Sequence, residues 1–140
     1  MRLDRQFASL RDEVMRTTES VFSHGQVLQG PEVQLLEREL EELFGRSHAV
    51  AVGSGTDALV LTLRALGLKP GAKVAVTSLS FVSSASAIVH AGGVPVFVDI
   101  DDGLMANMDV LSSLVSDHAV DGVVAVHLFG QMMDLEGIHA

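Results

Sequence analysis

Residues 49–59 read Ala-Val-Ala-Val-Gly-Ser-Gly-Thr-Asp-Ala-Leu and carry the clearest structural signal in the chain. The four apolar residues predict a short strand, the two glycines a tight turn, and the residues after the turn a helix. Because the strand is apolar throughout, rather than alternately apolar and polar, it is expected to be buried on both faces. A strand that runs through a glycine turn into a helix is typical of α/β proteins.

The same pattern continues towards the carboxyl end of the sequence. Short apolar runs predict three more strands, at residues 74–77, 94–100 and 122–127. Stretches long enough for crossover helices lie between the strands, at residues 57–66, 82–91 and 108–115. The order β-α-β-α-β-α-β predicts an α/β fold with a mainly parallel sheet and right-handed connections.

Two amphipathic helices are expected before the first strand. In residues 3–21, apolar side chains recur at helical spacings, namely Leu3, Phe7, Leu10, Val14 and Val21. The second helix begins with proline at its first position, in the pair Gly30-Pro31, and ends near Gly45. We interpret its charged face as a solvent-exposed surface, formed by Glu37, Arg38, Glu39, Glu41 and Glu42. The sequence thus divides into a helix and loop, residues 1–30, and an α/β region, residues 31–140.

The last residues indicate that the polypeptide continues. A turn at His127–Gln131 follows the final strand, and residues 132–140 have the pattern of a helix that stops before it could pack. A domain rarely ends inside such an element. We therefore expect the chain to be a fragment of a longer protein.

Composition argues against several classes of function. The 140 residues include 18 acidic and 9 basic side chains, and the formal net charge of −9 argues against nucleic acid as a partner. The chain has no cysteine, which excludes disulfides and a thiol nucleophile. No run is apolar and long enough for a membrane span, and the charged amino terminus does not resemble a secretory signal. A cytoplasmic protein without membrane contact is expected.

No metal site or catalytic group stands out in the sequence. The six histidines show no spacing typical of metal ligands. Asp99, Asp101 and Asp102 follow a strand, where carboxylates could bind magnesium. Asp-Asp-Gly is also typical of a turn, and we favour the turn.

The glycine turn at residues 53–56 is a candidate phosphate site. It places backbone N–H groups at the amino terminus of a helix, where anions are stabilised. Gly53 and Gly55 can adopt positive φ and let a ligand approach the main chain, while Ser54 and Thr56 add hydroxyl groups. The same residues would also suffice to turn the chain and cap the helix, so both interpretations stay open.

Residues 53–58 also match the dinucleotide fingerprint G-x-G-x-x-A. That fingerprint calls for an acidic residue at the end of the next strand to bind the ribose, where this chain has Thr77-Ser-Leu-Ser80. Phe81 follows, at the sheet edge where open α/β folds bind ligands, and its ring could stack on a flat cofactor. The alternative is that Phe81 belongs to the core.

Six motifs, taken in order, resemble one protein family. They are Gly30-Pro-Glu-Val33, Gly53-Ser-Gly-Thr-Asp-Ala-Leu59, Lys69-Pro-Gly-Ala-Lys-Val74, Leu79-Ser-Phe-Val82, Gly93-Val-Pro-Val-Phe-Val-Asp99 and Val126-His-Leu-Phe-Gly-Gln131. From about Leu28 onward, the chain is similar to the DegT/DnrJ/EryC1/StrS family of pyridoxal-phosphate-dependent sugar aminotransferases.

The resemblance implies that residues 31–140 are the first part of a fold-type-I large domain, which binds pyridoxal 5′-phosphate in a homodimer. It implies that Gly55 and Thr56 bind the cofactor phosphate and that Phe81 stacks on the pyridine ring. The implied substrates are a nucleotide-linked keto sugar and an amino-acid amine donor.

The resemblance also places the family's catalytic Lys and Asp beyond residue 140. Lys69 and Lys73 are expected at the opposite end of the sheet from Gly55 and Phe81, so neither is a substitute. The chain alone is therefore expected to hold no catalytic residue and to be inactive. Two alternatives remain: an NAD(P)-binding domain, and a family member that does not transaminate, such as a sugar dehydratase or a regulatory protein.

Overall fold

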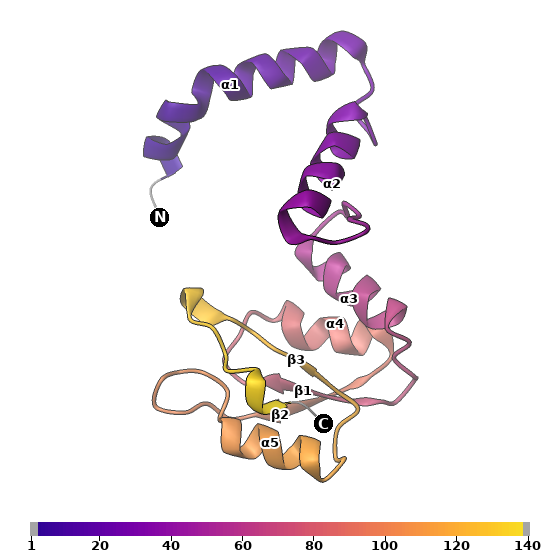
Figure 1. Cartoon of the computed structure of the whole chain (residues 1–140), viewed down its shortest axis with the longest axis vertical. Coiled ribbons are helices and arrows are strands. Elements are labelled where there is room, and N and C mark those ends of the chain that lie inside the picture. The colour runs from indigo at the N-terminus through magenta and orange to yellow at the C-terminus, as the bar shows by residue number, and fades with distance from the viewer. Residues whose placement is uncertain (1–2, 139–140) are drawn as a thin grey trace. The chain divides into compact units, whose positions relative to one another are not determined.

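The computed structural model describes residues 3–138 and contains two compact units, which meet in sequence between Ala51 and Val52. The first unit holds the helices α1 (Leu3–His24) and α2 (Pro31–Phe44), close to the predicted bounds. The second unit holds the α/β region (Figure 1). The predicted boundary at residue 30, between an N-terminal helix and loop and the large domain, stays a prediction.

The second unit is a parallel sheet with helices on both faces. Strands β1 (Lys73–Thr77), β2 (Val94–Val98) and β3 (Gly122–Val124) lie parallel in the order β2-β1-β3. The helix α3 (Gly55–Ala65) precedes β1, α4 (Ser83–Ala91) links β1 to β2, and α5 (Met108–Ser116) links β2 to β3. In Figure 1 the sheet lies between α4 and α5. The predicted α/β fold is confirmed.

The central strand β1 is buried on both of its faces. Val74 and Val76 pack against Ile88 of α4, and all three side chains are at most 1% exposed. Ala75, between the two valines, points to the other face and lies in a cluster with Leu111 of α5. Side chains alternate between the faces of a strand, so a strand covered on both sides is apolar throughout.

Close packing requires a glycine at Gly93, where α4 turns into β2. A β-carbon at this position would lie 2.9 Å from Leu68 Cδ2 and 3.0 Å from the carbonyl oxygen of Ala72. At the same end of the unit, the Arg64 guanidinium donates to the carbonyl oxygen of His90 at 2.7 Å. Because Arg64 is in the last turn of α3 and His90 in the last turn of α4, the two helices end together.

The prediction of a strand at residues 49–52 is wrong, because this segment pairs with no strand in the described part of the chain. Its backbone bonds to α2 instead. The Ala49 N–H donates to Glu41 Oε1 at 3.1 Å, and the Ala51 N–H donates to Glu37 Oε1 at 2.8 Å. The spacing of the two N–H groups along the extended chain matches the spacing of the two carboxylates along α2. Two residues of extended chain span about 6.6 Å, and four residues of helix span about 6 Å.

The same bonds correct the interpretation of the charged face of α2. Glu37 and Glu41 are half-buried and bind main-chain N–H groups, whereas Arg38, Glu39 and Glu42 are exposed as expected. A strand forms only where another strand supplies its hydrogen bonds. In residues 49–52, the N–H groups of Ala49 and Ala51 are bonded to carboxylates of α2 instead.

The prediction of a helix that begins at residue 132 is also wrong. Residues 132–138, the described part of that segment, contain only a 3-10 turn at Glu136–Ile138. The segment nevertheless packs, because Met133 is 5% exposed and lies in the cluster around Leu111. The Met133 N–H donates to His127 Nδ1 at 3.1 Å. Contacts of one buried side chain fix this segment, rather than the run of main-chain bonds that a helix needs. Residues 139 and 140 of the prediction lie outside the described part.

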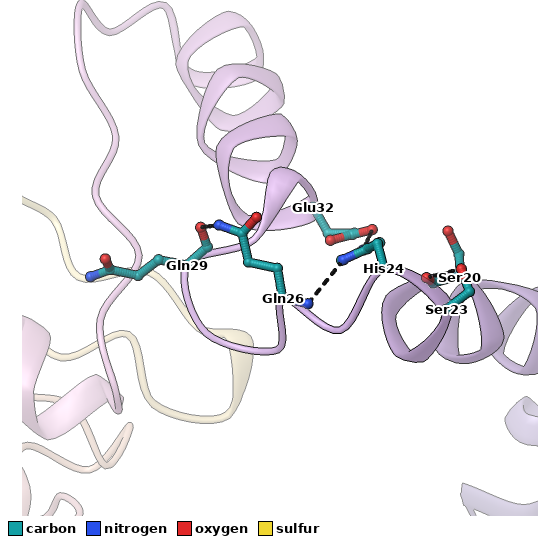
Figure 2. A network of polar contacts seen from close by, with 6 residues as sticks. All are labelled: Ser20, Ser23, His24, Gln26, Gln29 and Glu32. Atoms are coloured by element: carbon teal, nitrogen blue, oxygen red, sulfur yellow. Dashed lines mark hydrogen bonds and ion pairs between the residues drawn. The ribbon is translucent and has the colours of Figure 1, made fainter.

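A polar network fixes the corner between α1 and α2 (Figure 2). His24 Nδ1 accepts the Gln26 N–H at 3.1 Å, and His24 Nε2 lies 3.1 Å from Glu32 Oε1. Because Nδ1 accepts, the proton of a neutral imidazole is on Nε2, from which it is donated to Glu32. Gly30 is needed here, since a β-carbon would lie 2.5 Å from the Gln26 carbonyl oxygen.

This network leads to a prediction about Glu32. A backbone hydrogen bond, and after it the hydrogen bond from His24, hold the pKa of the Glu32 carboxyl below its ordinary value of 4.5. A pKa lowered in the folded chain means that the carboxylate adds stability above pH 4.5, which is lost as the pH falls through the folded pKa. His24→Ala is expected to raise the pKa of Glu32 towards 4.5, as measured by NMR titration of its carboxyl carbon.

Ser23→Ala is the control for this titration, because Ser23 bonds to the Ser20 carbonyl oxygen and not to Glu32. It should leave the Glu32 curve in place. A Glu32 curve that is the same with and without the His24 imidazole would contradict the assigned bond.

The apolar side of α1 is open in the structure. Phe7, Leu10 and Val14 are 48%, 41% and 44% exposed, and α1 contains no buried residue. None of the helices within residues 3–138 is both long enough and apolar enough to span a membrane.

Candidate cofactor site

The predicted site residues lie at one edge of the sheet. The three strands are parallel, so their carboxyl ends share an edge, and Phe81 follows the end of β1 there. The helix α3 ends beside the end of α4, and α4 starts at this edge, so α3 also starts here. The structure therefore brings Gly55 and Thr56, in the first turn of α3, to the same edge as Phe81.

Ser54 and Asp57 cap the start of α3. Ser54 Oγ accepts the Asp57 N–H at 3.1 Å and donates to Asp57 Oδ2 at 2.8 Å, which holds the carboxylate back against the cap. In the described part of the chain, nothing accepts a hydrogen bond from the N–H of Gly55 or Thr56. Capping and anion binding are thus not exclusive: one pair of residues caps the helix, and another pair keeps two donors open.

Neither glycine of the turn has the positive φ that the sequence allows for Gly53 and Gly55. The two glycines have different roles. A β-carbon on Gly53 would lie 3.2 Å from Asp57 Oδ2, so Gly53 makes room for the cap. A β-carbon on Gly55 would meet nothing within 4 Å, so the main chain is open to a ligand there. Two free N–H groups, the Thr56 hydroxyl and the positive end of an 11-residue helix suit a phosphate group.

The structure places Phe81 outside the core, which answers the question left by the sequence. Its side chain is 74% exposed. The backbone beneath it is fixed, because the Phe81 carbonyl oxygen accepts the Ser84 N–H at 3.0 Å and Ser80 Oγ lies 2.6 Å from Ser84 Oγ. An exposed ring on a fixed turn fits a flat aromatic ligand.

Sequence reasoning did not single out Thr77, the last residue of β1. Thr77 is 6% exposed, and within residues 3–138 its hydroxyl has no hydrogen-bond partner. A hydroxyl in an otherwise apolar run of the sequence was the available signal. A buried hydroxyl without a partner is unfavourable, so this end of β1 has an unmet hydrogen bond directly below the loop that carries Phe81.

Other candidates lie elsewhere or have structural roles. Lys73 begins β1, at the end opposite Phe81, as predicted. Asp101 Oδ1 accepts the N–H groups of Gly103 and Met105 at 2.8 and 3.1 Å, which confirms the predicted turn. Residues 3–138 contain no cluster of three His, Asp or Glu side chains that could hold a metal ion.

Comparison with known proteins identifies the family. The sequence model of the DegT/DnrJ/EryC1/StrS aminotransferase family matches residues 8–140. The chain belongs to this family. The resemblance seen in the six motifs is confirmed, and the match includes the glycine turn, which sets aside the NAD(P)-binding alternative.

Individual members of the DegT/DnrJ/EryC1/StrS family show how much of the family is present. The UDP-N-acetyl-3-dehydro-alpha-D-glucosamine 3-aminotransferase of Acidithiobacillus ferrooxidans is 37% identical over 96% of this chain and 36% of its own length. A DegT/DnrJ/EryC1/StrS aminotransferase from Brucella abortus is 30% identical, and the match covers 99% of this chain and 39% of the Brucella chain, with a TM-score of 0.85. NtdA of Bacillus subtilis, solved with bound PMP, is 28% identical, and the match covers 91% of this chain and 29% of NtdA, with a TM-score of 0.80. The chain spans about a third of these proteins.

Proposed function

We propose that this chain is the amino-terminal part of an aminotransferase that binds pyridoxal 5′-phosphate and aminates a nucleotide-linked keto sugar, using an amino acid as the donor. The observation that carries the proposal is the sheet edge shared by two open N–H groups, of Gly55 and Thr56, and the exposed ring of Phe81. The A. ferrooxidans relative is named for a UDP-linked dehydro sugar, and NtdA binds PMP, which support this choice of substrate and cofactor.

Within the proposal, the residues of this chain bind and orient. Gly55 and Thr56 donate their N–H groups, and Thr56 its hydroxyl, to the phosphate dianion at the start of α3. Phe81 covers one face of the cofactor ring and excludes water from it. When bound, pyridoxal phosphate supplies an electron-accepting ring and an aldehyde that can carry the amino group.

The proposal assigns no catalytic residue to the chain. We propose that the Lys that binds the cofactor covalently, and the Asp for its ring nitrogen, belong to the remaining two thirds of the protein. A chain limited to residues 1–140 would then be inactive. We also propose a cytoplasmic homodimer, for which the exposed apolar side of α1 offers contact surface.

A titration of the whole purified protein tests the cofactor. Added pyridoxal 5′-phosphate should give a saturable visible absorbance band, whereas NADH fluorescence should not change on mixing. Amine transfer should then be measured from glutamate to a UDP-linked keto sugar. A protein that changes NADH fluorescence, and gives no saturable band with pyridoxal phosphate, would overturn the proposal.

Phe81→Ala is expected to lower the affinity for pyridoxal 5′-phosphate by about fivefold and to shift the visible band, because stacking on an aromatic ring contributes about 1 kcal/mol beyond area burial. The measurement is an absorbance titration of the whole protein. Phe97→Ala is the matched control, since Phe97 is 61% exposed but lies within β2 rather than in the loop after β1. Equal affinities and spectra for all three proteins would count against the stacking role.

A further inference from the structure

A second aromatic side chain is displayed by the loop that follows β3. Phe129 is 88% exposed, and its backbone is left-handed, with φ 55° and ψ 24°. This conformation is unfavourable for a residue with a β-carbon, and unlike asparagine, phenylalanine has no side-chain hydrogen bond to offset it. Residues 3–138 thus leave a large apolar ring uncovered on a strained backbone.

The loop is held in this shape by several bonds. His127 Nδ1 accepts the Met133 N–H at 3.1 Å, which closes the loop at its base. The Gln131 N–H donates to the Leu128 carbonyl oxygen at 3.0 Å and forms the turn around Phe129. Met133 anchors the loop in the core, where its side chain is 5% exposed and its sulfur accepts the Val126 N–H at 3.3 Å. Strain persists only where its surroundings enforce it, and such positions concentrate at functional sites.

The sheet register relates Phe129 to Phe81. Strands β1 and β3 are parallel neighbours, and Val76 of β1 pairs with Val124 of β3. Phe81 comes five residues after Val76 (81 − 76), and Phe129 comes five residues after Val124 (129 − 124). Both loops leave the same edge of the sheet from adjacent strands. The two exposed rings are therefore carried by loops at the same edge, each five residues along the chain from a pair of hydrogen-bonded neighbours in the sheet.

We infer that Phe129 is a specificity-determining residue for the sugar substrate, and that its ring packs against the apolar face of the substrate's sugar ring. The inference rests on the proposed function, in which Phe81 is taken by the cofactor ring. The keto carbon must approach that cofactor, so the sugar ring lies closer to it than the nucleotide does. Aromatic rings pack well against the C–H groups of a sugar, and the exposed ring of Phe129 offers such a face.

The test compares binding of two probes to the whole, cofactor-loaded protein by calorimetry. Phe129→Ala is expected to weaken binding of UDP-N-acetylglucosamine about tenfold and to leave binding of UDP unchanged. Phe129→Tyr keeps the ring and should bind both probes as the unchanged protein does. The matched control is Phe97→Ala, because Phe97 is 61% exposed but lies within β2 rather than in a loop at the edge.

Other outcomes overturn the inference. Equal weakening of UDP and UDP-N-acetylglucosamine would place Phe129 at the nucleotide. Unchanged sugar binding together with a lower melting temperature would make Phe129 a packing residue. Failure of the proposed function is recognised separately, because the unchanged protein would then give no saturable band with pyridoxal phosphate. Normal cofactor binding with no effect of Phe129→Ala rejects this inference alone.

Discussion

Thr56→Val is expected to weaken binding of pyridoxal 5′-phosphate to the whole protein by about ten- to a hundredfold. A hydrogen bond to a charged group contributes about 1.5–3 kcal/mol, and about 1.4 kcal/mol corresponds to a factor of ten in affinity. Valine has nearly the same shape as threonine, so the first turn of α3 should persist, capped by Ser54 and Asp57. The dissociation constant is measured by absorbance titration, and the melting temperature is measured in parallel.

Thr62→Val provides the matched control, since Thr62 is an exposed threonine of the same helix, close to its other end. It should bind the cofactor as the unchanged protein does. The phosphate assignment fails if Thr56→Val and Thr62→Val bind pyridoxal phosphate with equal affinity.

Ile88→Ala is expected to lower the free energy of unfolding by about 3 kcal/mol, within the range for large-to-small changes in a core. Ile88 is 0% exposed and packs against Val74 and Val76, so removing its outer atoms leaves a cavity between α4 and β1. Urea unfolding of the whole protein, followed by circular dichroism, gives the free energy.

Val89→Ala separates burial from helix propensity in the same turn of α4. Val89 is 55% exposed, and its loss should cost much less than the loss of Ile88. Should the two variants unfold at the same urea concentration, the packing of α4 on the sheet would be wrong.

Features that depend on neighbouring residues in the sequence were predicted well. The pair Gly30-Pro31 marks the start of α2, and the glycine at position 45 ends it in the left-handed conformation, with φ 58°. The parallel order of the strands follows from the alternation of apolar runs and helices. The common edge of Gly55 and Phe81 does not follow from that order, because no strand precedes Gly55 in the described part of the chain; it follows from the packing of α3 beside α4.

Features that depend on partners distant in sequence were missed. Residues 49–52 have the composition of a strand, but composition does not reveal which groups accept their hydrogen bonds. From the residues alone the exposure of Phe81 stayed open, because phenylalanine is among the residues most often buried; the family resemblance was what predicted a ring available for stacking. The left-handed backbone at Phe129 is enforced by His127 and Met133, and no local pattern marks it.

The bonds from Glu37 and Glu41 to the main chain have a consequence for solubility. An apolar run with unpaired N–H groups is a template on which a second molecule can add a strand, and such edges seed aggregates. Here the N–H groups of Ala49 and Ala51, which point to the same side of the run, are occupied by carboxylates. Glu37 and Glu41 of α2 thus disfavour pairing of residues 49–52 with a strand of another molecule. They do so by occupying two particular N–H groups rather than through the net charge of the chain.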